Sequence, residues 1–93
     1  MEIQIDPHTL ERAEERGTNE EEIKEVINTG ISISGKYGRL GKFKIYDFKK
    51  ERNGKYFQQK RVEVIYTIKG DVIITVTVYV FYGKWRGEDA NSI

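Results

Sequence analysis

Histidine is the side chain that most often performs acid–base chemistry near neutral pH. His8 is the only histidine, and Arg12 and Arg16 follow it at intervals of four residues, so a helix would place all three on one side. A histidine can act as general acid or base, and an arginine can bind a phosphate through two N–H groups. This spacing is compatible with chemistry on a phosphodiester. A histidine after Asp-Pro is also typical of a surface or capping residue, and Arg12 could pair with a neighbouring glutamate.

The motifs of several other kinds of chemistry are absent from the sequence. The chain has no cysteine, its acids are scattered along the predicted helices, and no spacing of metal ligands is evident, so we expect no metal and no cofactor. The glycines at 35, 38 and 41 match neither a Walker loop nor a dinucleotide fingerprint and are interpreted as turn residues, although basic side chains beside them could wrap a nucleic-acid backbone. What remains is metal-independent cleavage of RNA, in which the substrate's own 2′-hydroxyl is the nucleophile.

Two helices and a sheet must position these residues. Asp6 before Pro7 and Gly17 predict a helix over residues 7–16, and Thr18 with Glu21 has the spacing of a capping box for a helix over residues 19–29. From residue 31 to 82 the apolar period changes to two, with turn signals between the segments. We expect an α+β fold with both helices on one face of a three- to four-stranded antiparallel meander. Residues 1–93 are predicted to form one domain, with a loose tail over 83–93.

The register of the strands predicts which side chains share a face. Pairing apolar with apolar residues, with a two-residue turn at 53–54 and a three-residue loop at 69–71, aligns Lys44 with Glu63 and Thr77 on the face away from the helices. The same register aligns Tyr46 with Arg61 and Tyr79 in a neighbouring row. These rows are unusually polar and aromatic for a sheet face. An ordinary cross-strand ion pair with solvated tyrosines would produce the same pattern, so this interpretation stays open.

The charges are strongly divided along the chain. Residues 36–61 hold ten of the sixteen Lys and Arg residues and two acids, a formal +8, whereas residues 1–30 carry a formal −6. A basic segment with aromatic residues in it is typical of nucleic-acid binding. We therefore expect RNA, either tRNA or mRNA, as the partner. The candidate catalytic residues are His8, Arg12, Glu63 and Tyr79, and the candidate RNA-binding residues are Lys42, Lys44, Tyr46, Arg61 and Thr77.

The sequence also resembles a known family. The order His8-x3-Arg12-x3-Arg16-Gly17, a Glu-rich helix ending in Val26-Ile27, and a final strand with Thr77 before Tyr79 are similar to a family of small prokaryotic and phage domains of unknown function. That family is grouped with the RelE and barnase-like ribonuclease toxins. The resemblance spans roughly residues 5–82 and implies the same fold, an endoribonuclease activity, and an antitoxin or immunity protein as partner.

Three functions therefore stay open. The first is a metal-independent endoribonuclease of the toxin type, and the second is a non-catalytic module that holds nucleic acid by stacking and phosphate contacts. The third is an interaction or structural protein, including a homodimer that buries the tyrosines. The sequence has no apolar run of membrane-spanning length, so we expect no membrane partner and a cytoplasmic location.

Overall fold

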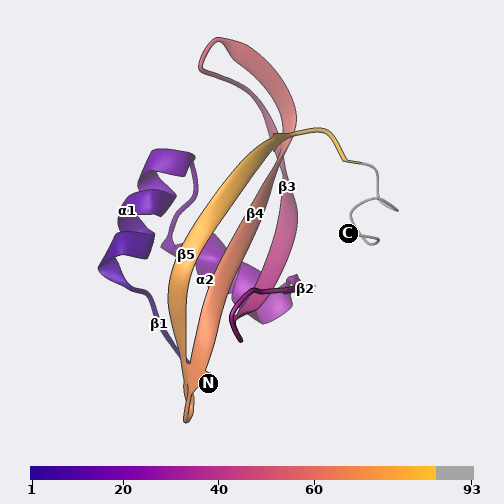
Figure 1. Ribbon diagram of the computed structural model, residues 1–93. Helices are drawn as coiled ribbons and strands as arrows, with labels where there is room; N and C mark the ends of the chain where they lie inside the picture. The colour runs from indigo at the N-terminus through magenta and orange to yellow at the C-terminus, as the bar shows by residue number, and fades with distance from the viewer. Residues whose placement is uncertain (86–93) are drawn as a thin grey trace.

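The computed structural model describes residues 1–85, which form two helices and one sheet (Figure 1). The helices are α1 (Pro7–Arg16) and α2 (Glu20–Thr29), and the sheet has the strand order β1-β5-β4-β3-β2. The strands are β1 (Glu2–Gln4), β2 (Ile31–Ser34), β3 (Leu40–Arg52), β4 (Lys55–Lys69) and β5 (Val72–Gly83). The predicted α+β class with two N-terminal helices is confirmed. The predicted loose tail begins at the last residue of β5, and residues 86–93 lie outside the described part of the chain.

The sheet differs from the predicted meander because it is mixed. β1 pairs parallel with β5, with Ile3 opposite Ile73, while the other strand pairs are antiparallel. The result is a five-stranded sheet instead of the three- to four-stranded antiparallel one. β1 has only three residues, too few for a period of two to be read from the sequence, although Ile3 and Ile5 pack against the core.

The local capping signals position both helices. The Asp6 side chain accepts a hydrogen bond from the His8 amide at 2.8 Å, and Gly17 ends α1 with φ 95°, where other residues would be strained. The start of α2 is one residue later than predicted: Asn19 is the N-cap, accepting from the Glu22 amide at 2.8 Å. The Glu22 carboxylate accepts from the Thr18 hydroxyl at 2.7 Å, so only the N-cap half of the predicted capping box is present, one residue further along.

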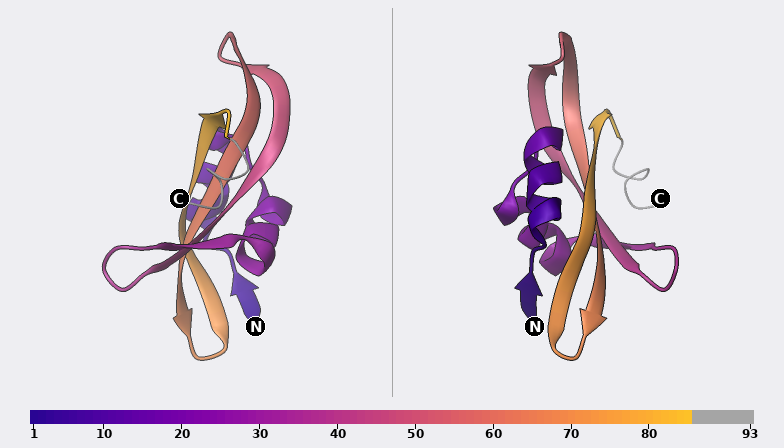
Figure 2. Two further views of the ribbon diagram at one scale, coloured as in Figure 1. Left: turned by 90° about the vertical axis from the view of Figure 1, so that its right-hand side faces the viewer. Right: turned by 60° about the vertical axis from the view of Figure 1, so that its left-hand side comes forward.

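Both helices cover one face of the sheet, as Figure 2 shows, while the β2–β3 hairpin projects from the opposite side. Ala13 of α1 and Ile23, Val26 and Ile27 of α2 pack on this face. Their partners on the strands are Val62, Val64, Tyr66, Ile73 and Val78. We call this the helix face and the other the open face. Because the helices bury one side only, the open face is available for binding.

A β-bulge in β3 overturns the predicted register of this strand. The two-residue turn at 53–54 is as predicted, with Arg52 opposite Lys55, but the pairing shifts by one residue between Asp47 and Lys50. Beyond the shift Lys44 lies opposite Val62 instead of Glu63. Since successive residues of a strand point to opposite faces, the shift moves Lys44 and Tyr46 to the helix face. The predicted row of Lys44, Glu63 and Thr77 is therefore wrong.

A second bulge shifts the pairing of β4 with β5. The turn has two residues, Gly70 and Asp71, not three, and Val76 is an extra residue between Thr75 and Thr77. Glu63 consequently lies opposite Tyr79, and Arg61 lies opposite Phe81. The predicted row of Tyr46, Arg61 and Tyr79 is wrong for this reason also. Pairing apolar with apolar residues could not locate either bulge, because that rule assumes an uninterrupted ladder.

The first bulge yields a stability prediction. Lys49 adopts φ 51°, a conformation that costs a residue with a Cβ atom more than it costs glycine. We expect Lys49→Gly to raise the free energy of unfolding by about 0.5–1 kcal/mol, measured by urea denaturation. The ion pair lost with Asp47 is exposed and 3.9 Å long, so its removal costs little. The matched control is Lys50→Gly in ordinary strand conformation, which should destabilise; equal effects of the two variants would contradict the assignment of the bulge.

Candidate functional site

Three of the residues predicted to bind RNA lie on the helix face, where their side chains contact α2. The Lys42 ammonium donates to the Ile27 carbonyl at 2.9 Å, and the Lys44 ammonium donates to the Thr29 hydroxyl at 3.0 Å. The Tyr46 hydroxyl donates to the Glu25 carboxylate. The last turn of α2 contains no basic residue of its own, so lysines from β3 supply the positive charge that a helix C-terminus favours. These side chains hold the helix on the sheet.

The contacts between Glu25, Tyr46 and Lys44 shift two pKa values in opposite directions. Burial, followed by the hydrogen bond to Glu25, raises the pKa of Tyr46 well above its ordinary value, which keeps the phenol protonated. The hydrogen bond from Tyr46, followed by the charge of Lys44 at 3.6 Å, lowers the pKa of Glu25. The group is therefore a structural one: the carboxylate is ionised at neutral pH, accepts a hydrogen bond from Tyr46 and forms an ion pair with Lys44.

The candidate catalytic residues of α1 do not meet those of the sheet. His8 has an exposed side chain, and its Nδ1 lies 3.9 Å from the Glu11 carboxylate. Arg12 pairs with Glu15 at 3.5 Å on the same helix. No hydrogen bond or pocket of the described residues brings either side chain together with Glu63 or Tyr79, which point from the open face.

Arg61 and Glu63 lie on the open face as predicted. Part of their role is structural, because they pair with each other over a buried ring. The Arg61 guanidinium lies 3.8 Å from the centroid of the Phe43 ring, and its Nε donates to the Glu63 carboxylate at 2.7 Å. This arrangement buries Phe43 to 1% exposure and Arg61 to 6%. A buried guanidinium is stabilised by the ring face and the carboxylate together. A pocket of about 380 Å³ lies beside the pair, lined by Arg61, Glu63, Phe81 and Trp85.

Two aromatic side chains stand exposed beside this pair. The rings of Tyr79 and Phe81 are stacked, with centroids 6.4 Å apart and planes 30° apart, and they remain 42% and 47% exposed. Arg16 reaches the edge of β5, where its guanidinium donates to the Val78 carbonyl and lies 5.3 Å from the Tyr79 ring centroid. A cation against a ring and an exposed stack are features that bind flat, electron-rich ligands.

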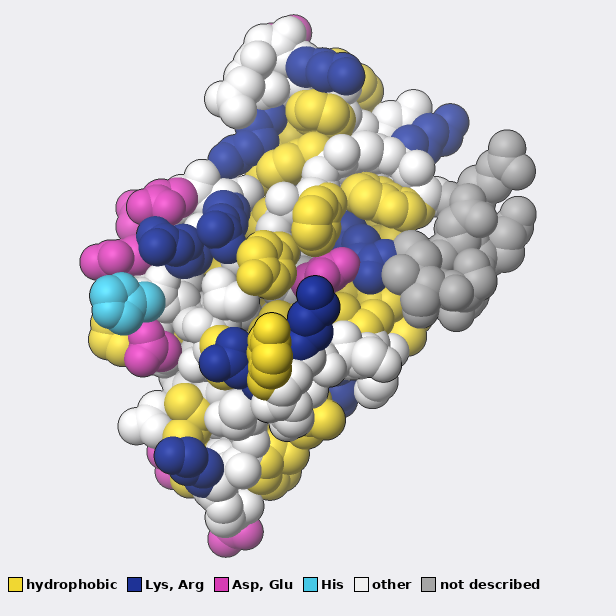
Figure 3. All heavy atoms as spheres, viewed as in Figure 1, with side chains coloured by type: hydrophobic (Ala, Val, Ile, Leu, Met, Phe, Trp, Pro, Cys, Tyr) yellow, Lys and Arg dark blue, Asp and Glu magenta, His cyan; other side chains and the backbone are white. Residues whose placement is uncertain are grey.

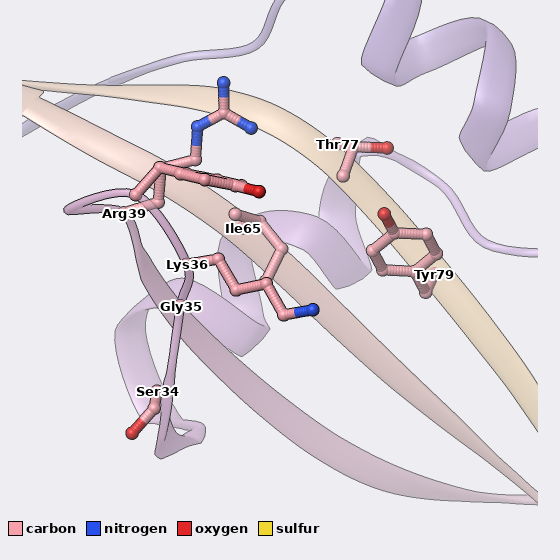
Figure 4. A pocket seen from close by; sticks show the side chains of 8 residues that line it. Ser34, Gly35, Lys36, Arg39, Ile65, Thr77 and Tyr79 are labelled. Carbon is pink, nitrogen blue, oxygen red and sulfur yellow. The ribbon is translucent and has the colours of Figure 1, made fainter.

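The β2–β3 loop adds further cations to the open face. Residues 34–39 and the neighbouring strands enclose a pocket of about 340 Å³, shown in Figure 4, with Lys36 and Arg39 on the loop and Thr77 and Tyr79 on β5. Ile65 reaches this pocket across Gly41, where a Cβ atom would lie 2.9 Å from Ile33 Cγ1 and 3.0 Å from Ile65 Cδ1. Hydrophobic side chains gather along the middle of this face, with Lys and Arg between them (Figure 3).

The open face thus combines predicted residues with others that the candidate list omitted. It brings together Arg61, Glu63, Thr77 and Tyr79, and it adds Arg16, Lys36, Arg39 and Phe81. The signal for Lys36 and Arg39 was present in the sequence, since both flank Tyr37 and Gly38 in a predicted turn. Phe81 falls within the segment predicted as strand, but the bulge at Val76, which brings Phe81 opposite Arg61, has no sequence signal that we recognise.

Two further observations concern metals and membranes. Across residues 1–85 there is no group of three or more His, Cys, Asp or Glu side chains arranged to hold a metal ion. Neither α1 nor α2, the helices of the described chain, is long and apolar enough to cross a membrane.

These features define an α+β domain with one face of a mixed sheet covered by two helices and the other face open. The chain belongs to the DUF4258 family: the model described as "Domain of unknown function (DUF4258)" matches residues 5–80. No curated protein and no solved structure matches the chain. The family description names no activity, so a function can be inferred only from the residues of the open face.

The pKa of Glu25 predicts a pH-dependent contribution to stability. A carboxyl group with a folded-state pKa below its ordinary 4.5 stabilises the protein above about pH 4.5, and this contribution is lost as the pH falls through the lowered pKa. We expect Glu25→Gln to lower the melting temperature at pH 7, and we expect the difference from the parent protein to shrink as the pH falls below about 4.5.

The matched control for this experiment is Glu14→Gln. Glu14 lies on the exposed side of α1 and forms no ion pair with another described residue. This variant should melt close to the parent protein throughout. A Glu25→Gln difference that is the same at pH 7 and pH 3 would contradict the role assigned to the carboxylate.

Proposed function

We propose that the open face binds single-stranded RNA. The observation that carries the proposal is the exposed, stacked pair of Tyr79 and Phe81, with the Arg16 guanidinium against the Tyr79 ring. Proteins that bind single strands place aromatic side chains on an open sheet so that unpaired bases stack on them, and each such stack is worth about 1–3 kcal/mol.

The charges beside the aromatic pair support a polyanionic ligand. Lys36 and Arg39 lie on the loop next to Tyr79, whereas the glutamates of α1 and α2 belong to the helices on the opposite face. A strand of RNA stacked on Tyr79 and Phe81 would extend its phosphates toward the loop cations. Binding through phosphates releases counterions, so the affinity should fall steeply as salt increases.

Hydroxyl groups on the same face favour RNA over DNA. Thr77 and Tyr79 both line the pocket beside the stacked pair, and each offers a donor and an acceptor. The ribose 2′-hydroxyl is the group that such side chains can recognise and that deoxyribose lacks. The RNA class, whether tRNA or mRNA, is part of the test and not of the proposal.

Endoribonuclease activity is the second candidate, favoured by one observation: Glu63 lies directly across the strand pair from Tyr79 and binds Arg61 at 2.7 Å. In this reaction the Glu63 carboxylate would take the proton of a 2′-hydroxyl, whose oxygen forms a bond to phosphorus. The bond from phosphorus to the 5′-oxygen breaks, and this oxygen takes a proton from the Tyr79 hydroxyl, leaving a 2′,3′-cyclic phosphate. Arg61 would stabilise the negative charge. His8 and Arg12 are outside this arrangement.

Binding is tested by fluorescence anisotropy with labelled single-stranded RNA and the same sequence as DNA. We expect Tyr79→Ala to weaken RNA binding about tenfold, because one base loses its stacking surface. The matched control is Tyr56→Ala, since Tyr56 is 55% exposed but lies near the end of the β3–β4 hairpin, away from the pocket. Equal losses in the two variants, or no dependence on salt between 50 and about 200 mM, would contradict the proposal.

Cleavage is tested by incubating the protein with total RNA and isolated tRNA in EDTA. If the second candidate holds, fragments ending in 2′,3′-cyclic phosphate form, and Glu63→Gln reduces their rate at least about a hundredfold while His8→Ala leaves it unchanged. RNA that is bound but stays intact would rule out cleavage and leave the binding function alone. A loss of cleavage in His8→Ala would instead show that the histidine takes part in catalysis.

A further inference from the structure

The pocket beside the Tyr79 ring has features that an RNA-stacking surface alone does not need. Its volume is about 340 Å³, in the lower range of small-ligand sites. Its lining combines loop residues with residues of β4 and β5. It contains two cations, four hydroxyl-bearing residues, one aliphatic side chain and one glycine. The lining residues are Ser34, Gly35, Lys36, Tyr37, Arg39, Ile65, Thr77 and Tyr79.

We propose that this pocket binds one nucleoside monophosphate unit, with its phosphate present as a monoester. The inference deepens the proposed RNA-binding function by naming the unit that is recognised, and its relevance to RNA rests on that function. The ligand could be the phosphorylated end of an RNA strand or a free mononucleotide, which share this chemistry.

The loop side of the pocket supplies the phosphate site. Lys36 and Arg39 extend from the two sides of a tight turn, in which the Arg39 amide donates to the Lys36 carbonyl at 3.1 Å. Neither side chain forms an ion pair with another described residue, in contrast to Lys44 on β3 and to Lys60 and Arg61 on β4. Both cations line the pocket, but Figure 4 shows their charged ends pointing in different directions, so a phosphate held by both requires one of these exposed side chains to turn toward the other. A phosphate in that position would accept charge-assisted hydrogen bonds from a guanidinium and an ammonium.

The absence of carboxylates from the lining favours a phosphate monoester over an internal diester. A monoester carries nearly two negative charges at neutral pH, whereas a diester carries one. With two cations and no acid among the eight lining residues, the attraction to the monoester is about twice that to the diester at equal distance. Internal phosphates of a strand therefore bind less well in this pocket.

The sheet side of the pocket supplies a surface for the base and the sugar. Ile65 and the Tyr79 ring offer apolar contact, and Figure 4 shows the Lys36 ammonium on the same side of the sheet as this ring. The Thr77 hydroxyl lies on the neighbouring position of β5 and can bind a ribose hydroxyl or a base edge. A base placed against Tyr79 would continue the stack that Phe81 begins.

The first test is isothermal titration calorimetry of the full chain with the four nucleoside 5′-monophosphates, the corresponding nucleosides and inorganic phosphate. We expect a nucleoside monophosphate to bind, and Lys36→Met and Arg39→Met each to weaken this binding about tenfold. Lys69→Met, at the exposed end of β4 away from the pocket, is the matched control and should leave the affinity unchanged. Binding of a nucleoside as tight as that of its monophosphate, or full affinity in both loop variants, would overturn the inference.

The second test compares RNA oligonucleotides that differ only in a 5′-phosphate, a 3′-phosphate or hydroxyl ends. At least about tenfold tighter binding of one phosphorylated end, lost in Lys36→Met, identifies the RNA end as the ligand. Equal binding of all three oligonucleotides together with binding of a mononucleotide identifies the free nucleotide. RNA binding with neither end preference nor mononucleotide binding would overturn this inference while leaving the proposed function intact. Mononucleotide binding without any RNA binding would instead overturn the proposed function.

Discussion

The structure depends most on the register of β3 against β4, which the bulge at Phe48 and Lys49 sets. If the pairing at the 53–54 turn ran on without interruption, Lys44 and Tyr46 would point to the open face and Phe43 and Ile45 would point to the helices. The bulge reverses both assignments. It thereby places lysines where α2 ends and places Phe43 beneath Arg61 on the open face.

With this register, the acidic N-terminal part of the chain packs against the basic part and forms contacts with it. The acidic helices lie on the basic part of the sheet: Lys60 donates to the Gly17 carbonyl and to Glu22, both at 2.8 Å, and Arg52 donates to the Glu15 carbonyl at 2.8 Å. Together with Lys42 and Lys44, these residues account for much of the +8 segment. The exposed cations of this segment that are left to act on a ligand are Lys36 and Arg39 of the β2–β3 loop, and Lys49, Lys50 and Lys55 near the β3–β4 turn. Part of the positive charge that suggested RNA is therefore used in contacts within the protein.

Local signals in the sequence predicted the local structure. Asp6 with Pro7, Gly17 and the Asn53-Gly54 turn each act through a few neighbouring residues, and each was found where expected or within one residue. The faces of β3 could not be predicted in this way. Lys42 and Lys44 lie on the helix face opposite valines, which breaks the rule that apolar residues pair with apolar residues. Their ammonium groups are acceptable there only because α2 ends beside them, a tertiary contact that no short window contains. Of the candidate site residues, Arg61, Glu63, Thr77 and Tyr79 share the open face as the alternation of β4 and β5 predicted, whereas the row that each joins was not predictable.

The most direct measurement is a methyl-resolved NMR titration of the protein with single-stranded RNA. Ile65 reports on the open face beside Tyr79, whereas Ile23 and Val64 report on the core beneath the helices. If the open face binds RNA, the methyl signals of Ile65 shift in proportion to bound RNA while those of Ile23 and Val64 stay nearly constant. Shifts confined to α1 and α2, with Ile65 unchanged under saturating RNA, would contradict the central claim.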